Sequence, residues 1–572
     1  MTPPPSLRLP FLAILLALSG ACALVYQMAW LREFRLVFGG ATPATAAVLA
    51  IFMGAMGAGS ALFGRKAEAS ANPLRLYALI ELGVGIAALL TPLLLSLVRS
   101  LYLSTGGIAA LGQVPATLLQ LLLATVVLAP PCLLMGGSLP AAFKWVETDQ
   151  DTQRGSLGVL YGVNTLGALT GVLVSTFWLL ELWGIRTTVM AAAGVNLLIG
   201  AAAWFVSRNE TSPKPTPLTD QDATVAPSPL TARFLYLAAG ITGFTFFLSE
   251  LVWFRILAPL LGSSVYGFGL ILALALAGIG LGGLLYRMLW ASRPGAVTLA
   301  ALSRVAAWQA LFLALPFALG DRIAVFAIDV NQLRSLGLPG QITGWTLIAS
   351  LLVLGPSILA GVQFPLLVGL LGSGSRDAGR HVGFAYAANT LGAITGSLAG
   401  GFILLPWLTA LGAWRWVFVL TLLLSLGAAV LGARSTSKWA WPVIAALWLS
   451  AGCLMFIPTG PTAAWRHKPI GYGRVESLPN SINGLRGWLH ASRWKIAHEF
   501  EGREASVAAV DSDDGYCLYV NGKSDGSAFG DADTQVMQGL VPAMLHPAPH
   551  TAFIVGLGTG TTADRKSTRL NS

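Results

Sequence analysis

The sequence predicts an all-α polytopic membrane protein made of two duplicated six-helix halves plus one extra helix, followed by a fragmentary α/β domain. Three observations predict it. Of the 572 residues, 55% are hydrophobic and only 10% are charged, whereas about a quarter are charged in soluble proteins. Mean hydropathy is +0.70. Apolar runs of about 20 residues, each able to cross roughly 30 Å of hydrocarbon, recur along the chain and repeat each other.

The apolar runs form two sets on either side of a polar, proline-rich stretch, which cannot bury itself and is predicted to be a linker. We expect membrane spans at 10–29, 42–63, 76–98, 115–140, 157–182 and 187–206, and then at 234–258, 265–290, 297–319, 342–371, 383–410, 414–433 and 439–457. The expected domains are a first half at 1–206, a linker at 207–233, a second half at 234–435 and an extra membrane helix at 436–458.

The two halves share sequence at a nearly constant offset. The strings "SGACALVYQMAWLR" (Ser19–Arg32) and "TGFTFFLSELVWFR" (Thr242–Arg255) match at an offset of 223, and "YGVNTLGALTG" (Tyr161–Gly171) matches "YAANTLGAITG" (Tyr386–Gly396) at 225. A drift of two residues is what insertions in loops produce, so we interpret the chain as an internal duplication. Because the first apolar run has a counterpart deep in the chain, it is expected to be a structural helix and not a cleaved leader.

Two halves of six spans each have the same orientation in the membrane, as in transporters of the major facilitator type. Loops on the side of the N-terminus carry more Lys and Arg than loops on the other side, which predicts a cytoplasmic N-terminus. The predicted location is a bacterial-type inner membrane, with the lipid bilayer as the surroundings of the chain. Thirteen crossings would place the C-terminal segment outside the cytoplasm, whereas twelve would leave it inside. The sequence therefore leaves open on which side of the membrane this segment lies.

Ionisable side chains inside the expected spans are candidates for function because they are costly in hydrocarbon. Glu81, Glu250 and Arg304 are such groups. At the offset of 223, Glu81 corresponds to Arg304 and Gln27 to Glu250, so an opposite-charge pair at related sites is expected. Such a pair is either a buried ion pair or headgroup contact that fixes helix packing, or part of a substrate path.

The matched "NTLGA" segments contain Asn164 and Asn389, which we expect to hydrogen-bond between helices beside small residues that allow close approach.

The net charge of +10 is explained by arginines that flank the spans, so no nucleic-acid partner is expected. The four cysteines and six histidines show no metal-ligand spacing, so no metal site is expected.

Beyond Pro458 the sequence changes to that of a soluble segment. Two β-prone runs within 504–527 surround a turn rich in Asp and Gly, which predicts a hairpin. The stretch 533–547 has apolar residues at helical spacing. "HTAFIVGLGTG" then predicts a buried strand that leads into Gly556, Gly558 and Gly560, and glycines there permit a tight turn and close approach to a nucleoside.

The string "LYVNGK…DTQVMQGLVPAMLHPAPHTAFIVGLGTG" resembles the spermidine synthase (aminopropyltransferase) family, in the form that carries a duplicated membrane domain in front. The resemblance implies that 459–563 is the N-terminal part of such a domain, with the first strand of a Rossmann-like methyltransferase fold. It implies decarboxylated S-adenosylmethionine, or S-adenosylmethionine, as cosubstrate and a small amine such as putrescine as acceptor. Gly556, Gly558 and Gly560 would contact the nucleoside, with Gln535 and Asp531 as pocket neighbours.

The chain departs from the family's pattern at its end. A Tyr-His-Glu in the family corresponds to Thr534, Gln535 and Val536, and the family's catalytic aspartate would lie beyond the glycine loop. The last residues, 564–572, resemble the translation of a common sequencing adapter, so we expect a longer natural chain and no catalysis by the chain as printed.

Three functions are therefore open at this point. The first is a membrane-bound aminopropyltransferase of polyamine biosynthesis. The second is a major-facilitator-like transporter of a polyamine or other solute, with a fused nucleoside-binding domain. The third is an S-adenosylmethionine-dependent methyltransferase.

Overall fold

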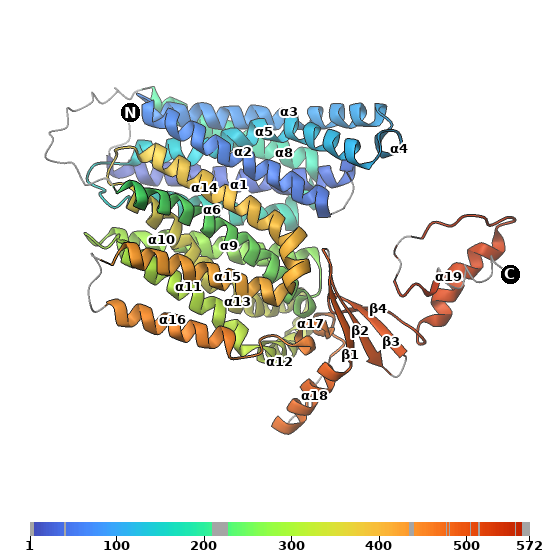
Figure 1. Cartoon of the computed structure of the whole chain (residues 1–572). Coiled ribbons are helices and arrows are strands. Elements are labelled where there is room, and N and C mark those ends of the chain that lie inside the picture. Colours follow the sequence, from blue (N-terminus) through green and yellow to red (C-terminus); the bar gives the residue numbers. More distant parts are fainter. Residues whose placement is uncertain are drawn as a thin grey trace.

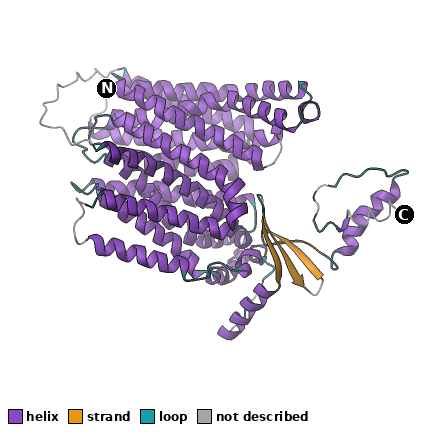
Figure 2. Cartoon of the chain, in the orientation of Figure 1, coloured by secondary structure: helices purple, strands orange, loops and turns teal. Residues whose placement is uncertain are grey.

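A computed structural model shows a long helical bundle with a small sheet at one end (Figure 1). The residues it describes are 5–38, 42–208, 227–433, 440–475, 478–479, 481–503, 505–512, 515–554, 556 and 558–562. Most of the predicted linker 207–233 and all of 564–572 lie outside these residues. Helices dominate, and strands occur only near the C-terminal end of the described chain (Figure 2).

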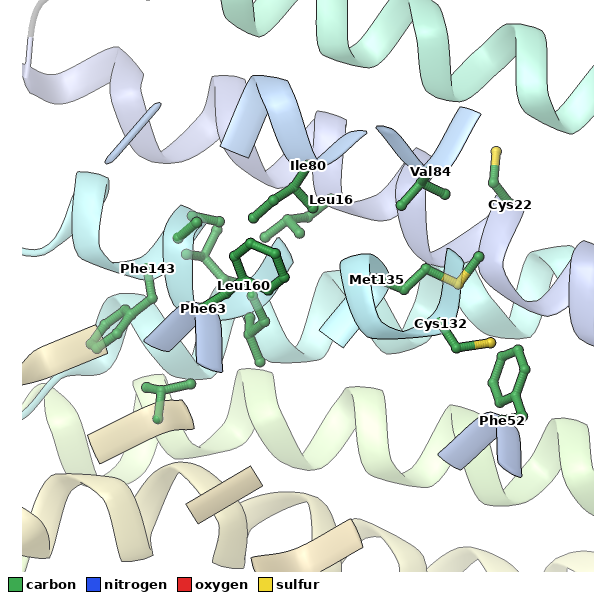
Figure 3. Close-up of a cluster of buried hydrophobic side chains, with 14 of the residues drawn as sticks. Leu16, Cys22, Phe52, Phe63, Ile80, Val84, Cys132, Met135, Phe143 and Leu160 are labelled. Atoms are coloured by element: carbon green, nitrogen blue, oxygen red, sulfur yellow. The ribbon is translucent and has the colours of Figure 1, made fainter. Parts of the chain in front are cut away.

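Six long helices form the first half of the bundle. They are α1 (Pro5–Phe38), α2 (Thr42–Ala69), α3 (Pro73–Ser104), α5 (Gln113–Val146), α6 (Gly155–Val174) and α8 (Gly184–Ser207), with the short α4 (Gly107–Leu111), π-helical η1 (Ser175–Leu179) and α7 (Leu180–Leu182) between them. Helix α2 packs on α5, α1 on α6 and α3 on α8. Their apolar side chains, such as Leu16, Phe63 and Met135, meet in a common core (Figure 3).

The second half repeats this plan. Its elements are α9 (Pro229–Leu261), α10 (Val265–Tyr286), η3 (Arg287–Ala291), α11 (Leu299–Leu319), α12 (Asp321–Val330), η4 (Asn331–Leu336), α13 (Gly337–Leu371), α14 (Ala378–Ala399), η5 (Gly400–Leu404) and α15 (Leu405–Leu431). No loop separates the predicted spans 383–410 and 414–433; they meet at a kink at Thr409, where φ is 62°. Helix α16 (Ala440–Phe456) packs on α11, where an extra helix was expected.

Within the described residues, ten helices are long and apolar enough to cross a membrane, and α16 is a shorter apolar helix. The chain is therefore a multi-pass membrane protein.

Matched glycines make the same helix contacts in both halves. A Cβ added to Gly59 would lie 1.8 Å from the backbone oxygen of Leu133, and one added to Gly282 would lie 2.0 Å from that of Ile358. The same kind of backbone contact occurs at the pairs Gly20 and Gly243, Gly136 and Gly361, Gly167 and Gly392, and Gly171 and Gly396. Lipid gives little hydrophobic drive for association, so close backbone packing holds these helices together.

The soluble part begins with three short elements and continues as an antiparallel meander. The elements are α17 (Ala463–His467), η6 (Ile470–Tyr472), α18 (Ile482–Trp494), β1 (Ile496–Glu501), β2 (Ser506–Ser512), β3 (Gly515–Val520), β4 (Lys523–Ser527) and α19 (Ala532–Leu545). Strand order is β1-β2-β3-β4. The predicted hairpin is confirmed as β2 and β3, which pair from Val507↔Val520 to Ser512↔Gly515. The predicted helix 533–547 is confirmed as α19.

The predicted buried strand before the glycine loop is wrong. Residues Thr551–Ile554 form no strand, and the side chain of Phe553 is 91% exposed. A strand needs a neighbour to take its backbone hydrogen bonds, and these residues make no backbone hydrogen bond to another described segment. The described chain therefore contains no parallel Rossmann-like sheet.

The sheet lies at the end of the bundle opposite the N-terminus (Figure 1). Arg255 in α9 holds it there: its Nη1 lies 2.9 Å from Glu501 Oε2, and it also donates to the backbone oxygens of Gly502 and Arg503. Since α16 begins at the N-terminal end and finishes beside the sheet, the soluble part lies on the side opposite the N-terminus. Below, the two ends of the bundle are called the N-terminal side and the sheet side.

The glycine contacts give a stability prediction. Gly59→Ala places a Cβ against the backbone of α5, so α2 must move, and such overpacking costs about 1–3 kcal/mol. We expect a lower melting temperature in detergent for this variant. The control is Gly194→Ala in α8, where nothing lies within 4 Å of the added Cβ. Equal melting temperatures for the two variants would contradict the packing described here.

Candidate functional site

The two halves meet along two helix pairs, α2 with α14 and α6 with α10, which we call the seam. On the N-terminal side the backbones touch. A Cβ added to Gly383 would lie 2.5 Å from the backbone oxygen of Ser60, and one added to Gly158 would lie 2.7 Å from that of Gly283. Ser60 and Gly283 are 223 apart, and Gly158 and Gly383 are 225 apart, so the two contacts correspond.

Toward the sheet side the same helix pairs separate. A Cβ at Gly54 would meet only the Ile394 side chain, at 3.6 Å, and one at Gly269 would meet only Thr176 Cγ2, at 3.9 Å. Side chains make the contact here, as where Phe177 stacks on Tyr266 with ring centroids 5.5 Å apart. The halves are thus in backbone contact at the N-terminal side and in side-chain contact at the sheet side.

Arg154 ties the halves together on the N-terminal side. It is completely buried just before α6, and its guanidinium reaches the loop between α13 and α14. It donates to the backbone oxygens of Val368 (3.1 Å), Gly374 (3.3 Å) and Arg376 (2.8 Å) and to His381 Nδ1 (3.1 Å). Since arginine only donates, His381 Nδ1 must accept, so that nitrogen carries no proton.

A second tie joins α2 and α5 to the start of α14. Glu68 Oε1 accepts from Lys144 Nζ at 2.6 Å and from the Asp377 backbone amide at 3.1 Å, and Oε2 accepts from the Gly379 amide at 3.0 Å. A carboxylate at a helix N-terminus satisfies free amides and the helix dipole. Glu68 therefore caps α14 of the other half.

Glu147 is a buried acid at the end of α5, beside these ties. Its side chain accepts from Ser156 Oγ, and its Oε1 has no hydrogen-bond partner among the described residues. Burial, with the nearby charge of Asp151, raises the pKa of Glu147 to about 9. The group therefore carries a proton at neutral pH in the folded chain.

Aromatic side chains from both halves meet at the seam. The ring of Phe364 in α13 lies 4.8 Å from that of Tyr161 in α6 and 6.0 Å from that of Tyr386 in α14, centroid to centroid. Tyr161 and Tyr386 occupy corresponding positions in the repeat. The cluster thus places one tyrosine from each half against a single phenylalanine.

Glu250 and Gln27 lie in the middle of α9 and α1, at corresponding positions. Both side chains are partly exposed. Within the described part of the chain, Glu250 makes no hydrogen bond and no ion pair, so its carboxylate is available to a solute or a proton.

Glu81 has a different environment. It is completely buried in the first half, where it accepts from Ser19 (2.9 Å), Ser138 (2.8 Å) and Asn196 (2.6 Å). These donors come from α1, α5 and α8, so the cluster joins four helices. Its donors satisfy the carboxylate, which indicates a role in packing.

The expected pairing of Glu81 with Arg304 is wrong. Arg304 is exposed on α11, and Glu81 contacts no cation among the described residues. The helix caps show why. Asn72 caps α3 and Thr298 caps α11, and each side chain accepts from the backbone amide three residues later. These equivalent caps are 226 residues apart, not 223. Insertion before the third helix shifted the register, so the two residues do not correspond.

The matched asparagines lie at helix contacts. Asn389 Nδ2 donates to the Ala239 backbone oxygen at 3.1 Å, joining α14 to α9. The backbone oxygen of Asn164 lies 2.2 Å from a Cβ added to Gly20, so the backbones of α6 and α1 are in close contact at this asparagine.

The glycine loop lies beside α19. Gly556, Gly558 and Gly560 have φ of 87°, 53° and 80°, which explains glycine at each position. Gln535 accepts from Thr559 Oγ1, and its backbone oxygen accepts from Thr562 Oγ1 at 2.9 Å. Asp531 instead accepts from the Ser527 amide at 2.9 Å, a contact within its own turn.

Sequence reasoning missed Arg154 and Phe364. Arg154 lies in a loop on the N-terminal side and contributes to the Lys and Arg excess there, but its position just before the repeated segment 161–171 at the seam does not show its contacts. Phe364 lies in an apolar run beside Pro365, and nothing in one sequence shows that both tyrosines pack on it.

No family model matches the chain, and no curated protein matches it. Solved structures do. A bacterial homologue of the iron transporter ferroportin in the outward-facing state is 11% identical, with a TM-score of 0.50 over 75% of this chain and 98% of that chain. The same protein with soaked iron is 12% identical, with a TM-score of 0.51 over 75% and 99%.

The proton:xylose symporter XylE of the major facilitator superfamily is 14% identical, with a TM-score of 0.44 over 75% of this chain and 95% of that chain. At such low identity, similarity shows only the fold, and here it rests on the two ferroportin-homologue structures. The membrane part therefore shares the fold of the ferroportin homologue, and the matched region covers 75% of this chain.

The buried acid gives a pH prediction. The folded chain holds a proton on Glu147 up to about pH 9, whereas the unfolded chain releases it near the ordinary glutamate pKa of 4.5. The free energy of unfolding therefore falls as pH rises between these values. Glu147→Gln stays neutral, so we expect its melting temperature to fall less from pH 5 to pH 8 and to exceed that of the unaltered chain at pH 8. Glu181→Gln, at an exposed position, is the control, and equal pH slopes for all three proteins would contradict the burial of an acid here.

Proposed function

We propose that this protein is a membrane transporter that moves a small cationic solute, of the amine class, between its two halves by alternating access. Glu250 is the solute-binding carboxylate. In this account the halves rock about the seam, as repeats do in transporters of this architecture. The protein lies in a bacterial-type inner membrane, with the N-terminal side in the cytoplasm.

The environment of Glu250 carries the proposal. An acidic side chain at the centre of a span costs about 2.5–3.5 kcal/mol on insertion scales, so it persists where it pairs or faces water. Glu81 shows the first solution, with three donors on its carboxylate. Glu250 has no such donors among the described residues, and its side chain is partly exposed, so a bound cation would satisfy its charge. An unpaired carboxylate there favours a cation.

The seam supports the direction of access. Backbone contacts and the buried Arg154 close the N-terminal side, whereas side chains alone join the halves at the sheet side. The path to Glu250 then opens toward the sheet side, and the cluster of Tyr161, Phe364 and Tyr386 closes it on the other.

The two solved structures on which the fold similarity rests are both of a bacterial homologue of the iron transporter ferroportin. Those names describe those proteins. They support transport as the class of function here and leave the solute to be argued from this chain's own residues.

Aminopropyl transfer, or methyl transfer from S-adenosylmethionine, is the second candidate. The hairpin, α19 and the contact of Gln535 with the positive-φ glycine loop favour it. Against it, the described sheet is an antiparallel meander on the side opposite the predicted cytoplasmic N-terminus. A protein with this second function would bind S-adenosylmethionine analogues equally well with or without the Glu250 carboxylate. Binding of such an analogue to Glu250→Gln therefore distinguishes the two candidate functions.

Uptake into proteoliposomes tests the proposal, with putrescine, spermidine and a neutral sugar as probes. Glu250→Gln removes the charge and keeps the shape, so we expect amine uptake to fall by about tenfold or more, as loss of a charged contact predicts. Glu181→Gln, exposed on the sheet side, should transport like the unaltered protein. Amine uptake that survives Glu250→Gln unchanged would contradict the assignment.

A further inference from the structure

A groove of about 940 Å³ crosses the seam on the N-terminal side, and none of the residues argued above for transport line it. Helix α14 forms its floor, with α2 of the first half on one wall and α9 of the second half on the other. Its lining includes Arg65, Tyr236, Arg380 and Phe384 near the end of the bundle and Leu391 farther along α14. We call it the seam groove.

The seam groove faces outward from the bundle. Leu391 is 65% exposed, and it lies at helical spacing from Phe384 and Ala388 on one face of α14. Tyr386 lies on the opposite face of the helix, where it packs on Phe364 at the seam. In a bilayer the lining face of α14 is therefore exposed to lipid.

The groove is charged at one end and apolar at the other. Arg380 is the third residue of α14, whereas Leu391 lies 11 residues on, about 16 Å along the helix at 1.5 Å per residue. That length is about half of the roughly 30 Å hydrocarbon layer, so the groove covers one leaflet. Its charged end lies at headgroup level and its apolar end beside the acyl chains.

Two arginines, Arg65 and Arg380, and two carboxylates, Glu68 and Asp377, line the charged end, and Arg65 is the arginine without an acidic partner among the described residues. Arg65 lies over the ring of Phe384, 4.8 Å from its centroid, and has no acidic partner among the described residues. Both oxygens of Glu68 are occupied by Lys144 and by the amides that begin α14. Arg380 has one carboxylate nearby, Asp377 at 3.4 Å, and its side chain is 51% exposed.

We infer that the seam groove binds an anionic phospholipid, with its phosphate on Arg65 and Arg380 and an acyl chain along Phe384 to Leu391. Guanidinium groups suit phosphate because they donate in a planar fork, and basic residues beside a membrane attract anionic headgroups. The apolar floor explains why the occupant is a lipid and not a free anion.

The position of this site implies a consequence for the two halves. Arg65 belongs to the first half, and Arg380 belongs to the second. A phosphate held by both arginines stabilises the arrangement in which the N-terminal side is closed. The lipid therefore acts together with Glu68, which lines the groove and joins α2 to α14, and with Arg154, which joins the start of α6 to α14.

Native mass spectrometry of the full chain tests the inference, with phosphatidylglycerol and phosphatidylcholine as probes. We expect one phosphatidylglycerol to be retained by the unaltered protein and retention to fall about tenfold or more in Arg65→Gln/Arg380→Gln, since charged hydrogen bonds are lost. Arg293→Gln, exposed on the same side and outside the groove, is the matched control and should retain it. Phosphatidylcholine should not be retained.

A second variant guards against misfolding of the first. Ala387→Phe keeps both arginines and fills the groove, so it should also lose the lipid. Equal retention by the double variant and Arg293→Gln, or full retention by Ala387→Phe, would overturn the inference. Displacement of the lipid by millimolar inorganic phosphate would also overturn it, since a soluble anion would then suffice. No transported solute is present, so this result is independent of the Glu250 experiment.

Discussion

Backbone contact at glycine is the constraint on which the rest of the structure depends. In lipid, apolar side chains gain little by leaving one apolar neighbour for another, so helices associate through close packing. At Gly59, Gly167 and their counterparts Gly282 and Gly392, an added Cβ would lie 2.0 Å or less from a backbone oxygen of the next helix. These contacts make each half a stiff body that can move as a unit.

If each half is stiff, any movement of one half relative to the other changes the contacts at the seam. There the backbone contact is confined to the N-terminal side, where Arg154 and Glu68 add hydrogen bonds between the halves. Two bodies held firmly at one end and by side chains at the other can exchange which end is closed. In the proposed transport cycle, the unpaired carboxylate of Glu250 and the tyrosines of the seam lie between the parts that move.

Much of this fold could be predicted from the sequence because it depends on local patterns. The apolar runs, the repeated "NTLGA" segments, the β2–β3 hairpin and α19 were of this kind. The pairing of Glu81 with Arg304 was not, because an insertion before the third helix changed the register without leaving a local mark. The strand expected at Thr551–Ile554 needed a neighbour, which no local pattern supplies. Glu250 was identified from its position, but its lack of partners is a property of the folded chain.

Distances between spin labels on the two halves test the central claim most directly. One pair, Thr152 and Ser292, reports the N-terminal side, and the other, Glu181 and Ser263, reports the sheet side; all four side chains are exposed. Arg154→Gln removes hydrogen bonds that join the two halves on the N-terminal side. The account predicts that the first distance then lengthens and the second shortens together, as two rocking bodies require. Lengthening of the first distance with no change in the second would show local loosening and contradict alternating access.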